Sequence, residues 1–190
     1  MTPLCAKIYI DLLGATTQTG DLKTQYGGGS TFACNLTNNS VFFLKGIYNF
    51  TVITHPADAS QINDQKDDYS FIMIMPGIEY HYQVSTLPIF LKSSLGIGIG
   101  KGEFEPYEIM DPTSTTNIAP QNFSDNGLCI AGWVGLLYNA TQRISPFLEI
   151  GYHYSVFMDD FKDADIHGIQ VLFGVRFTVY GKNKEISSDY

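Results

Sequence analysis

Apolar and polar residues alternate with a period of two along most of this chain, in eight separate segments. In each segment one set of alternate positions is apolar and the other is mixed, which is the pattern of a β-strand with two different faces. In the clearest segment, Leu95, Ile97 and Ile99 alternate with glycines. The expected strands span residues 7–15, 30–37, 41–53, 69–82, 89–100, 126–138, 146–155 and 169–179.

The connections between these segments alternate in length. Residues 38–40, 83–88 and 139–144 form short connections, whereas long ones span 16–29, 54–68, 102–124 and 156–165. In an up-and-down meander every second connection lies at the same rim. Short turns at one rim and long loops at the other are typical of outer-membrane barrels. The long loops hold thirteen acidic residues and three lysines, so we expect four long acidic loops, the first ending in a flexible Gly27-Gly28-Gly29.

The distribution of size and charge predicts which strand face points outward. The apolar set carries about five large residues per strand, too many for the interior of an eight-stranded barrel, which its own side chains just fill. That set contains no Asp, Glu, Lys or Arg, as expected where a basic residue at the bilayer midplane costs ~2–4 kcal/mol. We therefore expect an all-β, eight-stranded antiparallel up-and-down transmembrane β-barrel. A soluble lipocalin-like ligand-binding barrel, with the two faces exchanged, is the alternative.

The mixed face would then line the lumen. It carries both charges and histidines, and unpaired charges in such a place would be very costly. We therefore expect an ion-pair and hydrogen-bond network that fills the lumen instead of an open pore. Its expected members are Lys7, Asp11, Lys45, Glu79, His81, Lys92, Glu149, His153 and Arg176.

Composition narrows the possible classes of function. The 190 residues suit one domain, which we place at 1–180 with a short polar tail at 181–190. A net charge of −8 with eleven basic residues argues against nucleic-acid binding. No run approaches the ~18 apolar residues of a membrane helix. The chain also opens without a signal-peptide pattern, so we expect any export signal to have been removed or never present.

The last expected strand carries a more specific signal. Residues 172–180 read LFGVRFTVY, which is similar to the Gly-x-x-aromatic-x-hydrophobic assembly signal of a final barrel strand, here Gly174, Phe177, Val179 and Tyr180. With this strand and the loop asymmetry, the chain resembles the small outer-membrane barrels of Gram-negative bacteria, such as the OmpA transmembrane domain, OmpX and the surface antigens. The resemblance implies a bacterial outer-membrane location, the lipid bilayer and the barrel-assembly machinery as partners, and loops that contact a host or environmental ligand.

The strongest enzymatic candidate is the pair His153 and Ser155, which lie two apart and so share a strand face. The pair resembles the His-x-Ser of the outer-membrane lipid A deacylase, where the dyad faces lipid and a Glu supports it. Here the alternation places both residues in the lumen, and Gln170 stands in the place of the acid. We expect no cofactor, no metal and no enzymatic activity, and a surface or adhesion role for the loops. A deacylase-like barrel enzyme remains the other alternative.

Overall fold

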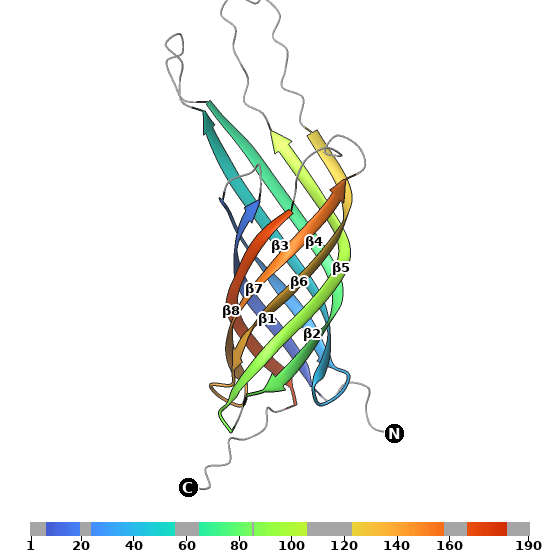
Figure 1. Cartoon of the computed structure of the whole chain (residues 1–190), viewed down its shortest axis with the longest axis vertical. Helices are drawn as coiled ribbons and strands as arrows, with labels where there is room; N and C mark the ends of the chain where they lie inside the picture. The colour runs from blue at the N-terminus through green and yellow to red at the C-terminus, as the bar shows by residue number, and fades with distance from the viewer. Residues whose placement is uncertain are drawn as a thin grey trace, which may run out of the picture.

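The structure, a computed structural model, describes residues 7–19, 24–55, 65–84, 86–105, 123–157 and 167–181. It is a closed barrel of eight antiparallel strands in which each strand pairs with its sequence neighbours and β1 pairs with β8 (Figure 1). The strands are β1 (Ile8–Thr19), β2 (Thr24–Asn35), β3 (Ser40–His55), β4 (Gln65–Gln83), β5 (Ile89–Glu105), β6 (Phe123–Tyr138), β7 (Ile144–Phe157) and β8 (His167–Tyr180). The predicted fold class and strand order are confirmed.

The outward and inward faces also follow the alternation. The expected apolar positions point away from the barrel axis, where Ile97 and Ile99 are each 62% exposed. The expected lumen positions are buried, including Asp11, Lys92 and Arg176. A soluble lipocalin-like barrel would need the reverse arrangement, so that alternative is wrong. Within the part of the chain that is described, no helix is long and apolar enough to cross a membrane.

The first long loop was predicted wrongly. β1 continues to Thr19 and β2 begins at Thr24, so the predicted 14-residue connection shrinks to residues 20–23. The glycine triplet is not a loop end but part of β2, where Gly27 pairs with Asn49 and Gly29 with Ile47. A Cβ on Gly27 would lie 1.9 Å from the Tyr48 carbonyl oxygen. Glycine is therefore needed here because the neighbouring backbone approaches too closely for a side chain.

Four adjacent strands extend beyond the others. β3, β4, β5 and β6 have 16, 19, 17 and 16 residues, against 12 for β1 and β2 and 14 for β7 and β8. Figure 1 shows them rising above their neighbours at one rim. We call this part of the barrel, formed by the ends of β3–β6, the raised edge.

Charged side chains mark where the raised edge leaves the apolar belt, which is the band of exposed apolar residues around the outer surface. The outward face of β5 is uncharged from Ile89 to Ile99, close to the ~9–11 residues that a tilted strand needs to cross the hydrocarbon. Beyond it, Lys101, Glu103 and Glu105 point outward, and Glu105 pairs in register with Asp68 of β4. The raised edge therefore begins above Ile99 and stands outside the hydrocarbon.

The opposite rim carries the short turns. The strands there are joined by residues 36–39, 84–88 and 139–143, and the Thr37 and Thr141 hydroxyl oxygens accept bonds from the backbone amides of their turns. Ile8, the first residue of β1, pairs there with Tyr180, the last of β8. Gly181 follows with φ 82°, a left-handed conformation that favours glycine and ends the strand. The predicted tail beyond Gly181 lies outside the described residues.

Candidate functional site

The centre of the lumen is organised around Arg176 of β8. Its guanidinium forms a two-point contact with Asp11 of β1, with Nε donating to Oδ1 at 2.7 Å and Nη2 to Oδ2 at 2.8 Å. The same group donates from Nη1 and Nη2 to the two carboxylate oxygens of Glu79 on β4, at 2.6 and 3.2 Å. A planar guanidinium with several fixed donors suits this double contact, whereas a lysine could not make it.

Two lysines extend the network across the lumen. Lys92 Nζ of β5 lies 2.8 Å from Glu79 Oε2 and 3.2 Å from Glu149 Oε1. Lys45 Nζ of β3 lies 3.4 Å from the other oxygen, Glu149 Oε2. Glu149 Oε1 also accepts a hydrogen bond from the Ser94 hydroxyl at 3.3 Å. The chain of contacts therefore runs from β1 through β8, β4, β5 and β7 to β3.

Aromatic rings also contact the lysines and the arginine of this network. Lys45 Nζ lies 3.9 Å from the Trp133 ring centroid, and Lys92 Nζ lies 4.6 Å from that of Phe147. The Arg176 guanidinium carbon lies 5.0 Å from the Tyr9 ring centroid. Such cation–π contacts stabilise a desolvated cation by about 2 kcal/mol. They were not predicted, because the sequence does not show which lumen side chains on different strands meet.

The network balances charge and excludes solvent. Lys45, Lys92 and Arg176 face three carboxylates, and all six residues are at most 1% exposed. A continuous water path beside them would leave accessible surface on their side chains. In this layer of the lumen the structure therefore shows a packed ionic plug.

Two predicted members of the network lie at its margin. His81 Nε2 contacts Glu79 and lies 3.3 Å from Arg176 Nη1, but the ring is partly exposed. Lys7 is half-buried and precedes β1, where its carbonyl oxygen accepts a bond from the Asn35 amide. The plug is thus smaller than the predicted set: these two side chains are partly solvated, and His153, a third predicted member, has no hydrogen-bond partner among the described residues.

A second, uncharged layer lies nearer the raised edge. Trp133 Nε1 donates to Gln170 Oε1 at 2.9 Å, Gln170 Nε2 donates to Thr17 Oγ1 at 3.0 Å, and Thr17 Oγ1 lies 3.4 Å from Asn49 Oδ1. This row of hydrogen bonds links β6, β8, β1 and β3. Gln170, which stands in the place of the acid that supports the dyad of the lipid A deacylase, is a structural member of this row.

The candidate catalytic pair is not assembled as a dyad. Both residues face the lumen, and His153 is 0% and Ser155 5% exposed. The Ser155 hydroxyl lies 3.1 Å from Cys129 Sγ, while the His153 ring packs against Phe71 with centroids 5.9 Å apart. A base and a nucleophile need to be within hydrogen-bond reach of each other and of the substrate. Among the described residues, neither ring nitrogen of His153 has a hydrogen-bond partner, so the two side chains do not form this contact.

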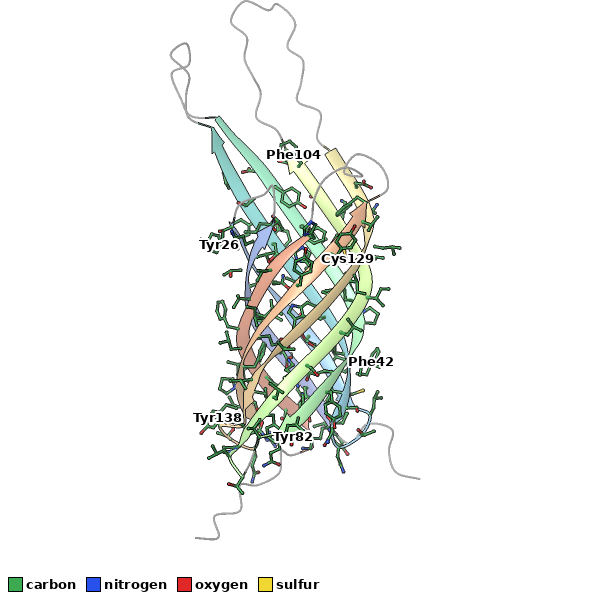
Figure 2. All side chains as sticks on the ribbon, in the orientation of Figure 1. Tyr26, Phe42, Tyr82, Phe104, Cys129 and Tyr138 are labelled. Atoms are coloured by element: carbon green, nitrogen blue, oxygen red, sulfur yellow. The ribbon has the colours of Figure 1, made fainter. Side chains whose placement is uncertain are left out.

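The outer surface carries aromatic residues at both ends of the apolar belt. Tyr82 and Tyr138 lie at the rim of the short turns and Tyr26 lies toward the opposite end (Figure 2). Several aromatic side chains near strand ends are exposed, namely Tyr48, Phe50, Tyr80, Tyr82, Tyr138, Tyr152 and Tyr154. Amphipathic rings at this height suit the boundary between hydrocarbon and headgroups. Phe177, Val179 and Tyr180 of the predicted assembly signal also face outward.

Neither a protein-family model nor a curated protein sequence matches the chain. Solved structures do. OprG from Pseudomonas aeruginosa superposes with a TM-score of 0.60 at 12% identity, covering 93% of this chain and 98% of that one. Neisserial surface protein A gives 0.58 at 10% identity, covering 90% and 95%. This chain has the fold of the small outer-membrane β-barrels.

A third solved structure of this fold includes a ligand. The attachment invasion locus protein Ail of Yersinia pestis, in complex with the heparin analogue sucrose octasulfate, superposes with a TM-score of 0.53 at 15% identity over 90% of this chain and 96% of that one. At such identities the likeness concerns the course of the backbone. The plug and the acidic raised edge are properties of this chain's own residues.

Proposed function

We propose that the chain is a non-enzymatic integral outer-membrane protein that contacts its surroundings through the raised edge and the loops joined to it. The observation that carries the proposal is the outward face, which is apolar and uncharged over one membrane thickness and carries charges only beyond it. Water could not solvate so large an apolar surface, so the belt requires hydrocarbon. The rim that carries the charges then faces the cell exterior.

The charge of the raised edge supports a particular kind of partner. Asp68, Glu103 and Glu105 point outward there, and Lys101 is paired with Glu103. The connecting segments add more acidic than basic residues. A sulfated ligand like the one bound to Ail would be repelled by this edge. We therefore propose a basic partner surface, and a contact that weakens as salt increases.

Two features support a role without catalysis. The plug excludes water from the centre of the lumen, and the pair His153 and Ser155 is buried there without mutual contact. A lipid substrate at the outer surface would not reach these groups. In the same scheme, Gly174, Phe177, Val179 and Tyr180 are proposed to be read by the barrel-assembly machinery during insertion.

Cysteine labelling on intact cells tests location and orientation together. In a chain with Cys5→Ser and Cys34→Ser, the remaining Cys129 is 1% exposed and should stay unlabelled. A membrane-impermeant maleimide should label Glu105→Cys on intact cells, but the matched variant Thr141→Cys only after the outer membrane is permeabilised. Labelling of both variants without permeabilisation, or recovery of the protein in the soluble fraction, would refute the proposal.

A further inference from the structure

Two potential metal ligands face the lumen side by side above the plug. Cys129 of β6 and His153 of β7 are 1% and 0% exposed. The register pairs Cys129 with Ser155 and Ala131 with His153, so the thiol and the imidazole are diagonal neighbours on the same face of adjacent strands. Side chains in this relation are within reach of one another. Figure 2 marks Cys129 well above Tyr82 and Tyr138, toward the rim of Phe104.

The His153 side chain is unusual because it is buried with its polar atoms unused. Among the described residues, neither ring nitrogen has a hydrogen-bond partner. Buried polar groups are almost always paired, and an unpaired one costs about 1–3 kcal/mol. An imidazole in this state leaves both of its nitrogens available to bind a ligand.

The surroundings identify the chemistry of that ligand. Phe71 stacks on His153, and a Cβ built on Gly100 would lie 2.5 Å from Cys129 Sγ and 2.8 Å from Phe71 Cε2. The thiol and the imidazole therefore border the same aromatic ring. Met73, which is 0% exposed, lies two residues from Phe71 on the same face of β4 and pairs in register with Gly100. The register therefore places a thioether side chain on the lumen face beside the strands that carry the thiol and the imidazole.

We propose that Cys129 and His153 form a binding site for a Cu(I) ion, with the Met73 thioether as a third donor. Sulfur and imidazole donors select soft ions over Ca²⁺ and Mg²⁺, which need oxygen ligands. Structural zinc usually takes four ligands, and in the described part of the chain no three His, Cys, Asp or Glu residues gather into such a set. Cu(I) is stable with two or three donors.

The charge balance of binding suits a buried site. Cu⁺ replaces the thiol proton, which leaves to the buffer, and a copper–sulfur bond forms while the S–H bond breaks. No oxidant or reductant is consumed, and the thiolate cancels the ion's charge. The low-dielectric lumen therefore gains no net charge, which avoids the large cost of burying an isolated ion.

Competition with a chromogenic Cu(I) chelator tests the site. The protein with Cys5→Ser and Cys34→Ser, refolded in detergent under reducing conditions, should bind one equivalent of Cu(I). His153→Gln and Cys129→Ser should each lower the affinity at least tenfold. The matched control, which retains Cys34 but carries Cys5→Ser and Cys129→Ser, should bind no better than the variant without any cysteine.

Folding of each variant is checked by its heat-dependent migration on a gel. If Cys129→Ser does not assemble, His153→Gln decides the question alone, because its side chain is polar and of similar size. X-ray absorption of the loaded protein should show both sulfur and nitrogen ligands. Absence of stoichiometric binding, or an affinity unchanged by His153→Gln, would overturn the proposal and assign the imidazole to buried water.

Discussion

Replacing Arg176 with methionine should be the most damaging single change in the lumen. The substitution keeps most of the side-chain volume but removes all four hydrogen bonds to Asp11 and Glu79. Glu79 keeps Lys92 at 2.8 Å, whereas Asp11 loses its two-point contact with the guanidinium. Breaking a buried pair by removing one partner costs about 3–5 kcal/mol, because the other charge stays buried without compensation. We expect Arg176→Met to lose that much unfolding free energy.

A second substitution separates the contribution of the ion pair from the cost of the charge that is left unpaired. Asp11→Leu combined with Arg176→Met leaves two lysines facing two carboxylates, so the lumen is again neutral. Well-packed apolar residues can replace a buried ion pair with little loss of stability. The double variant should therefore recover most of the stability that Arg176→Met loses. Additive losses would mean that the pair is not electrostatically coupled.

Urea unfolding in detergent micelles measures both effects. The chain has one tryptophan, Trp133, and it lies in the lumen beside Lys45, so its fluorescence reports the opening of the barrel directly. The matched control is Arg143→Met, because Arg143 is exposed in a turn between β6 and β7. The reasoning fails if Arg176→Met costs less than about 1 kcal/mol or no more than the control.

Further predictions concern packing, the membrane, activity and conduction. Gly27→Ala should destabilise the barrel by about 1–3 kcal/mol. Gly46→Ala should not, because its Cβ would have no neighbour closer than 4.0 Å. Urea unfolding compares the two variants. Ile97→Arg should make the free energy of refolding into vesicles less favourable by about 2–4 kcal/mol, and Val52→Arg, near the rim, by about 0–1 kcal/mol. Equal costs would count against the placement of Ile97 in the hydrocarbon. Expressing either the parent or Ser155→Ala should leave lipid A unchanged by mass spectrometry, and a deacylated species made only by the parent would restore the enzyme hypothesis. In planar bilayers the parent should pass no steady current, because the plug fills the lumen; stable channels would contradict that.

The connections show where the sequence was misleading. Gly27-Gly28-Gly29 predicts a loop in any local scheme, because glycine is depleted in strands. In the barrel the same residues lie within β2. Glycine is needed there because a Cβ at Gly27 or Gly29 would lie 1.9 or 2.0 Å from a carbonyl oxygen of β3. That requirement comes from the neighbouring strand β3, whose Tyr48 and Gly46 lie 21 and 17 residues further along the chain. The ends of β4 and β5 were also predicted too short, because charged residues there face water beyond the membrane instead of ending the strands.

The sequence by itself determined the number of strands, their order and the direction in which each side chain points. Period-two alternation is a local property that any strand must respect, and a continuous uncharged set such as Leu95, Ile97 and Ile99 can be stable outward only in hydrocarbon. Only the tertiary structure decided which lumen groups meet. Arg176 binds Glu79 from 97 residues away, and Lys45 meets Glu149 from 104. Those contacts depend on the stagger between strands around the closed barrel, which no single strand encodes.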